Sequence, residues 1–200
     1  MFFSATILAS VGFLATLAHG NPASLLSRAE DVGFEVFLDE SGAVESFENA
    51  ARLGVDIFGP IPSDARRVDD HWEADPGTKA LAWIRAQADI DWDALPQEKR
   101  DEIEKRQGSG AANINLSVWT GDNCKGGVVY WDNVSYNVNY WNNNNLYSIG
   151  ISLRSIRDNE HLDLSRLKNG DACGQFVLRV GSGQGCLTTN VYNCFRLWVE

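Results

Sequence analysis

The chain has 200 residues, of which 27 are acidic and 17 basic, so its formal net charge is −10. Hydrophobic residues make up 44% and charged residues 22%, a composition that excludes a disordered tail, a collagen-like fibre and a multi-span membrane protein. The acidic balance argues against a binder of nucleic acid that works through a basic surface, so we expect no nucleic-acid partner.

The residue classes are not spread evenly along the chain. Of the 27 acidic residues, 20 lie at or before Arg106, as do all five prolines, whereas all four cysteines follow it. Residues 107–200 hold seven acidic and seven basic side chains and are formally neutral. This break predicts three segments: a signal peptide at 1–20, an acidic propeptide at 21–106 and a working domain at 107–200.

The first twenty residues contain an apolar run without a charged side chain, and they end in Ala18, His19 and Gly20. Small residues at the minus-three and minus-one positions are typical of a secretory signal peptide. The apolar run is shorter than the roughly 20 residues that a membrane-spanning helix needs. We therefore expect an extracellular protein with no membrane span.

The middle segment is predicted to be partly helical. Apolar side chains recur at helical spacing over 80–88, and a second helix that starts at 93–96 is charged on nearly every face. A helix without an apolar stripe gains little from packing, so its carboxyl end should be accessible. Earlier, 34–38 and 55–58 alternate as two paired strands would.

A dibasic pair, Lys105 and Arg106, stands at the composition break and is followed by the flexible stretch 107–110. This arrangement resembles the cleavage site of a kexin-type processing protease, particularly in fungal secretory precursors. The resemblance implies such a protease as a partner, with a cut that separates propeptide from product. Two other dibasic pairs, at 66–67 and 99–100, do not coincide with the break. The propeptide would assist folding, mask the product or serve only as a spacer.

Four cysteines in the last 94 residues of an exported chain predict two disulfides. Three pairings are possible, and the sequence leaves all three open. We favour a short loop between Cys186 and Cys194, which leaves Cys124 with Cys173. The spacing of the cysteines does not fit a zinc site.

Period-two alternation of apolar and polar side chains dominates the last segment, and each such run predicts a strand with one buried and one wet face. Residues typical of turns separate the runs, including the asparagines at 142–145. The pattern predicts an all-β domain, an antiparallel sandwich or small barrel, after the partly helical propeptide. The predicted strands lie at 114–118, 134–140, 147–153, 176–180 and 195–199.

Trp119, Cys124 and Gly126 are spaced as in the folded hairpin of βγ-crystallin domains, which this part of the chain resembles. That family binds calcium through a loop of paired Asn or Asp followed by hydroxyl residues. The resemblance implies calcium ligands at Asn144, Asn145 and Ser148, with Ile149 in the place of the last hydroxyl. The alternative is that the asparagine run is a polar hairpin turn.

The cysteine layout and the ending Cys194-Phe195-Arg196-Leu197-Trp198 are similar to those of small secreted cysteine-containing proteins of filamentous fungi. Many of these are effector candidates. The resemblance therefore implies a product that acts outside the cell.

Two N-glycosylation motifs begin at Asn115 and Asn133. Both asparagines lie on the polar phase of predicted strands, so glycans there would not disturb a core. We expect a glycoprotein with at least one motif used.

Enzyme chemistry has few candidate residues in the last segment. His161 is its one histidine, whereas a two-histidine mechanism needs a second proton carrier. Asp158, Glu160 and Asp163 are the only cluster of carboxylates, and charged residues near a turn are usually hydrated. We expect no enzyme.

Trp131 and Trp141 border the asparagine run, where an exposed ring beside amide groups would stack on a sugar. The alternative is that both fill the core, because large aromatics dominate cores. The leading hypothesis is a non-enzymatic secreted effector or toxin-like protein, released by dibasic cleavage, with an unknown extracellular target. The second is a glycan-binding or cell-wall-binding module, and the third is a small secreted hydrolase.

Overall fold

A computed structural model of the protein describes residues 40–104 and 112–200. The predicted signal peptide, the strand predicted at 34–38 and the dibasic pair Lys105 and Arg106 lie outside these residues. The elements in chain order are α2 (Glu40–Arg52), β1 (Arg66–Val68), β2 (His71–Ala74), α3 (Lys79–Asp89), α4 (Gln97–Glu104), β3 (Asn115–Trp119), β4 (Val128–Trp131), β5 (Tyr140–Ser152), β6 (Glu160–Lys168), β7 (Asp171–Val180) and β8 (Gly185–Val199). We call 40–104 the covering segment and 112–200 the sheet domain.

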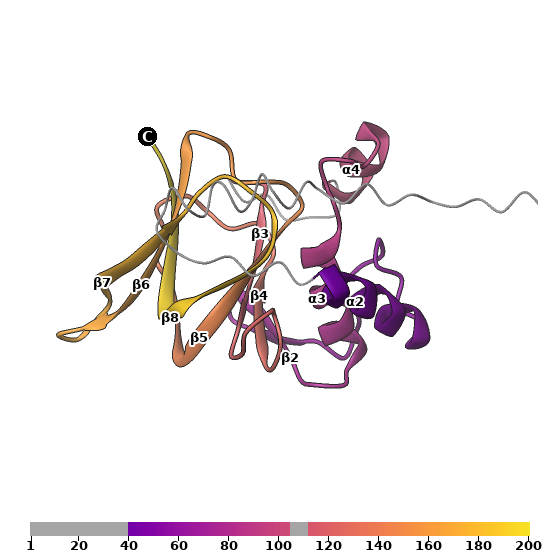
Figure 1. Cartoon of the computed structure of the whole chain (residues 1–200), viewed down its shortest axis with the longest axis horizontal. Helices are drawn as coiled ribbons and strands as arrows, with labels where there is room; N and C mark the ends of the chain where they lie inside the picture. The colour runs from indigo at the N-terminus through magenta and orange to yellow at the C-terminus, as the bar shows by residue number, and fades with distance from the viewer. Residues whose placement is uncertain (1–39, 105–111) are drawn as a thin grey trace, which may run out of the picture.

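All eight strands belong to one antiparallel sheet in the order β1-β2-β4-β3-β5-β8-β6-β7. Antiparallel β structure with two disulfides is therefore confirmed for the sheet domain. The strands are not divided into two hydrogen-bonded sheets, and the terminal strands β1 and β7 do not pair with each other. The sheet also takes in β1 and β2 from the covering segment, which the sequence did not predict. The helices lie beside β2, β3 and β4, and β6 and β7 lie at the opposite end (Figure 1).

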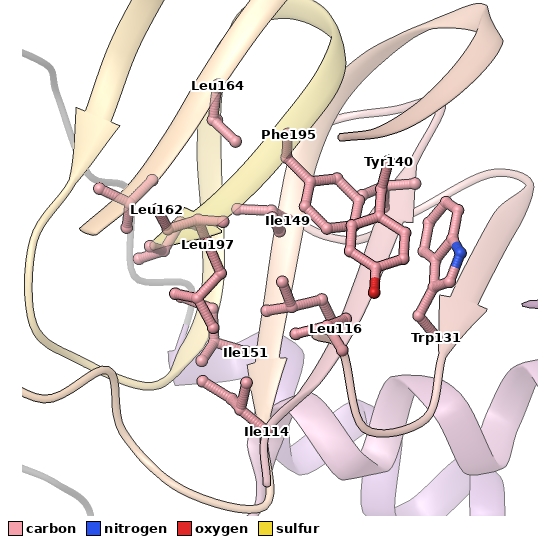
Figure 2. Packing of buried hydrophobic residues seen from close by; sticks show 14 of the residues in the cluster. Ile114, Leu116, Trp131, Tyr140, Ile149, Ile151, Leu162, Leu164, Phe195 and Leu197 are labelled. Atoms are coloured by element: carbon pink, nitrogen blue, oxygen red, sulfur yellow. The ribbon is translucent and has the colours of Figure 1, made fainter. Parts of the chain in front are cut away.

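One face of the sheet, the inner face, carries the main hydrophobic core. A row of large side chains crosses it, because Tyr140, Phe195, Leu164 and Leu178 lie opposite one another on β5, β8, β6 and β7. The rings of Tyr140 and Phe195 stack with centroids 5.0 Å apart, and Trp131 meets both edge-on (Figure 2). Every buried member of this core belongs to the sheet domain. The sheet domain thus contains a core of its own.

The asparagines at 142–145 form a bulge within β5. Trp141 lies opposite Cys194 and Leu146 lies opposite Tyr192, so four residues of β5 face a single residue of β8. A bulge of this kind leaves the extra residues unpaired and bends the strand. The prediction of a turn between two strands is therefore wrong at this point.

The strand predicted over 134–140 is also wrong, except for Tyr140. Asn133 and Asn137 have positive φ angles of 57° and 62°. This left-handed backbone region is incompatible with an extended strand and is tolerated best by asparagine and aspartate. The segment instead makes an irregular connection from β4 to β5.

The outer face of β3, opposite the inner core, is not exposed to solvent. All five residues of β3 are buried, including Asn115 and Ser117 of the polar phase. The expectation of one wet face is wrong for this strand because α3 of the covering segment lies across the outer face.

α3 (Lys79–Asp89) coincides with the run at 80–88 whose apolar spacing predicts a helix. Its amino end is capped by Thr78, whose hydroxyl accepts a hydrogen bond from the Leu81 N–H at 3.1 Å. The carboxylate of Asp64 accepts two more, from the N–H groups of Lys79 and Ala80 at 2.8 and 2.9 Å. These bonds satisfy donors that have no partner inside the helix.

The strand predicted at 55–58 is wrong, because this segment runs as turns. The Asp56 carboxylate accepts from the Phe58 N–H at 3.1 Å, a local bond that favours a turn over a ladder. Among the helices of the described residues, none is long and apolar enough to cross a membrane.

The disulfides join Cys124 to Cys186 and Cys173 to Cys194, with Cα atoms 6.0 and 5.4 Å apart. The favoured pairing of Cys186 with Cys194 is therefore wrong. Both lie on β8, where eight residues of extended chain span roughly 26 Å. A disulfide tolerates a Cα separation of at most about 7 Å.

Gly150 on β5 generates the first prediction. A Cβ there would lie 2.3 Å from Ser117 Oγ and 2.9 Å from Ala88 Cβ, so Gly150→Ala should lower the free energy of unfolding by about 2 kcal/mol through overpacking. Urea denaturation of the full chain measures it. Gly127→Ala is the matched control, because its Cβ would meet Thr120 at an ordinary 3.6 Å. Equal stabilities for the two variants would contradict the close approach of α3 to β5.

Candidate functional site

The outer face of the sheet is covered at one end and open at the other. At the covered end, α3 packs on β5 and β8, and Ala88 lies so near Gly150 that a Cβ there would come within 2.9 Å of the Ala88 Cβ. The absence of a side chain at Gly150 allows this approach. At the other end, β6 and β7 extend away from the helices (Figure 1).

A second hydrophobic cluster joins the covering segment to the sheet domain. Trp83 and Ile84 of α3 pack with Trp119 of β3 and Tyr130 of β4. The rings of Trp83 and Tyr130 meet edge-on at 90° with centroids 5.7 Å apart, a favourable aromatic geometry. Burial, together with the nearby Asp132 charge, raises the pKa of the Tyr130 hydroxyl well above its usual value. Tyr130 therefore stays neutral within this interface.

β2 covers the edge of the sheet domain. It pairs antiparallel with β4, with Trp72 opposite Tyr130, and the β4 residues are all buried. A hydrophobic edge strand such as β4 would otherwise offer unpaired backbone groups to another chain. Arg67 and Asp132 add an ion pair at 3.2 Å, but both side chains are more than a third exposed, so it contributes little.

A third contact lies beyond the carboxyl end of α3. Ile90 and Trp92 form a small buried cluster with Leu153 of the sheet domain. The Gln184 side chain accepts from the Trp92 N–H at 3.2 Å and donates to Asp91 at 2.8 Å. The covering segment is thus held by apolar packing, a strand pairing and polar bonds.

The interface is incompletely filled between α3 and β4. A cavity of about 230 Å³ is lined mostly by the covering segment, including Trp72, Trp83 and Trp92, and by Tyr130 and Asp132 of the sheet domain. Its walls are largely apolar, so it reflects imperfect packing between two bodies rather than a polar reaction site.

A buried ion pair fixes the start of the sheet domain. Arg154 donates to both carboxylate oxygens of Glu160 at 2.7 and 2.8 Å, and to the backbone carbonyls of Ala112 and Asn113. The Tyr136 hydroxyl donates to the same carboxylate, whose side chain is 1% exposed. The chain is therefore anchored a few residues after the predicted cut.

This network decides the charge of Glu160. Burial opposes ionisation, but hydrogen bonds from Arg154, from the Arg157 N–H and from Tyr136 outweigh it and lower the pKa of the carboxyl. Burial and the bond to the ionised Glu160 raise the pKa of the Tyr136 hydroxyl. Glu160 is thus ionised and Tyr136 neutral near pH 7, which closes the network.

The two glycosylation motifs are joined by hydrogen bonds. The Asn115 side chain is buried, and its carbonyl oxygen accepts from the Asn133 N–H at 2.7 Å. The Asn133 side chain accepts in turn from the Asn113 N–H at 2.9 Å. These amides tie β3 to the connection after β4, which is why Asn115 does not lie on an exposed polar face. Glycan attachment stays a prediction.

The two tryptophans proposed for glycan binding are not brought together. Trp131 is 3% exposed and packs in the inner core, whereas Trp141 is 54% exposed. The predicted platform of both rings is therefore not formed, and the core alternative holds for Trp131. Trp141 remains available on the surface.

The residues proposed as calcium ligands are separated by their bonds. Ser148 is buried, and its hydroxyl donates to the Gly121 carbonyl at 2.6 Å and accepts from the Cys124 N–H at 2.9 Å. Asn144 and Asn145 are exposed on the β5 bulge. No group of three His, Cys, Asp or Glu suited to a metal occurs in 40–104 or 112–200. Calcium binding at these residues stays a prediction.

The histidine and carboxylate cluster considered for catalysis is engaged in structural contacts. His161 packs on Trp198 with ring centroids 4.5 Å apart and pairs with Glu200 at 3.1 Å. Asp163 accepts hydrogen bonds from Arg179 and from the indole N–H of Trp198, and Glu160 points into the buried network. These groups do not converge on a shared pocket.

The feature that sequence reasoning missed is the covered face. The only local signal was the alternation around 66–74, with its acidic turn at 69–70. No family model, curated protein or solved structure matches the chain. The covering segment and the sheet domain meet over the edge of β4 and over an apolar part of the outer face.

Glu160→Gln gives a prediction with a defined pH dependence. Because the folded-state pKa is lowered, the ionised carboxylate stabilises the protein above its unfolded-state pKa, and this stabilisation is lost as pH falls through the folded-state pKa. The variant should lose about 2 kcal/mol of unfolding free energy at pH 7. Its stability should also fall less steeply than that of the wild type between neutral pH and acid.

Denaturant midpoints measured across that range test this expectation. Glu98→Gln on the exposed face of α4 is the control and should change neither quantity. If the unfolding free energy of Glu160→Gln fell as steeply towards acid pH as that of the wild type, the network would not be the source of the pH dependence.

Proposed function

We propose that the chain is the precursor of a secreted, non-enzymatic binding protein, an effector or toxin-like factor that acts outside the cell. A processing protease cuts after Arg106, and residues 107–200 are the working domain. Residues 40–104 cover part of the binding surface of that domain until the propeptide, 21–106, leaves.

One observation carries this proposal. The covering segment occupies both the edge of β4 and the outer face around Trp119 and Gly150. Its removal would uncover an apolar strand edge and an aromatic surface at the same place. Both are features by which proteins recognise partners.

The separate core supports a domain that survives the loss of its cover. The buried residues of the inner core all belong to 112–200, and two disulfides lie in the same segment. The buried ion pair of Arg154 and Glu160 holds the first residues of this domain without help from the covering segment.

The local structure of the other two dibasic pairs disfavours a cut there, which supports the cut after Arg106. A processing protease needs an extended substrate, and the pair at 99–100 lies within α4. At 66–67, Arg66 is paired with Glu73 and Asp75, and Arg67 is paired with Asp132, all on the sheet edge. The pair at 105–106 follows directly after α4 ends.

After the cut, dilution would separate the covering segment from the sheet domain. Before it, the two parts are joined by a short linker, which gives an effective concentration in the millimolar range. After it, the same contacts become intermolecular, and a secreted product at low concentration loses them. The third hypothesis, a hydrolase, lacks support from the contacts of His161 and its neighbouring carboxylates.

Arg106→Gln tests the processing step in a fungal host that carries a kexin-type protease. Intact mass of the secreted wild type should correspond to a product that begins at Gln107, and the variant should retain 21–106. Arg67→Gln is the matched control and should be processed as the wild type is. A wild-type product that begins near Asn21 would overturn the proposal.

Sedimentation of the purified precursor, cut in vitro, then tests release. The cut protein should be one species at high concentration and two at low concentration, while uncut Arg106→Gln stays one species throughout. Two species that never reassociate on concentration would show that 40–104 is not a cover.

A further inference from the structure

The open end of the outer face presents a row of side chains across four strands. Trp141 on β5 lies opposite Cys194 on β8, which lies opposite Ser165 on β6, which lies opposite Phe176 on β7. Residues opposite one another project from the same face of a sheet. This row is the outer counterpart of the core row that contains Tyr140.

The side chains at the two ends of the row are aromatic and exposed, and those in the middle are short. Trp141 and Phe176 are 54% and 58% exposed, and with Leu167 they are the three most exposed large hydrophobic residues of the described chain. Between Trp141 and Phe176 lie only a serine and the Cys173–Cys194 disulfide, whose side chains are short. Ser165 and Cys194 between the rings are only 8% and 1% exposed, so the two rings are the accessible part of the row.

Neutral amides border the row. The β5 bulge places the exposed Asn143, Asn144 and Asn145 next to Trp141 in the chain. Amide side chains donate and accept hydrogen bonds without a net charge. An exposed aromatic plane beside such groups suits a ligand with both an apolar face and many hydroxyls.

Two pairs of opposite polarity lie beside the row. Arg179 donates to both oxygens of Asp163 at 2.7 and 3.1 Å, and His161 pairs with Glu200 at 3.1 Å. The Arg179 guanidinium also covers the Trp198 ring at 4.8 Å, so this ring supports the surface and is not itself a stacking face. Carboxylates thus accompany two of the basic side chains beside the row, which disfavours a polyanion as the ligand.

We propose that this open face binds a neutral, β-linked polysaccharide through Trp141 and Phe176, with the β5 asparagines as hydrogen-bonding partners. Pyranose rings whose hydroxyls are equatorial present flat C–H faces that pack on aromatic rings. The two rings lie three strand spacings apart, roughly 14 Å, so the ligand that touches both is an extended polymer. The site is independent of the covered face.

Binding is tested with the uncut full chain, Arg106→Gln, so that the result does not depend on processing. Depletion onto insoluble chitin, cellulose and β-1,3-glucan is measured, with amylose as the α-linked comparison. The full chain should bind at least one β-linked polymer and not amylose. Trp141→Leu and Phe176→Leu should each weaken binding about tenfold, which corresponds to about 1.4 kcal/mol.

Matched variants separate ring stacking from general apolar contact. Trp141→Phe keeps a ring and should bind within about threefold of the parent. Val138→Ala removes an exposed apolar side chain outside the row and should bind as the parent does. No binding to any β-linked polymer, or equal binding by Trp141→Leu, would overturn the proposal, and capture of a protein partner by the same row would do so as well.

Discussion

The approach of Ala88 on α3 to Gly150 on β5 is the contact on which the arrangement of the two parts depends. It brings Trp83 onto Tyr130 and sets the covering segment where β2 can add to the edge of β4. A larger side chain at Gly150 would hold the helix away from the sheet. The buried residues of the inner core all belong to the sheet domain, whereas a second cluster joins the two parts. Our proposal requires that this second contact can separate without unfolding the sheet.

Much of the local structure follows from the sequence. Alternation located β3 and parts of β5, β7 and β8, and the apolar spacing located α3. Local patterns fail where backbone conformation or distant partners decide. The asparagines at 142–145 look like a turn but form a bulge, because Trp141 and Leu146 both find partners on β8. Periodicity also does not reveal that the polar phase of β3 is covered by a helix from earlier in the chain.

The candidate surfaces show the same division between local and distant information. The dibasic pair and the four cysteines can be recognised in the sequence. The disulfide partners cannot, because they depend on which strands are neighbours. Trp131 and Trp141 have similar surroundings in the sequence, yet one is in the core and the other on the surface. The outer face thus has two ends with different roles in our account. One is hidden until the cover leaves, and the other is open throughout.

Hydrogen exchange of the sheet domain, measured after the cut and after separation of the two chains, tests the central claim most directly. We predict that amide protection falls in β4 and around Gly150, where the cover is lost, and persists in the strands that build the inner core, β5, β6 and β8. Loss of protection throughout 112–200 would contradict the account, because it would mean that the two parts share one indivisible core.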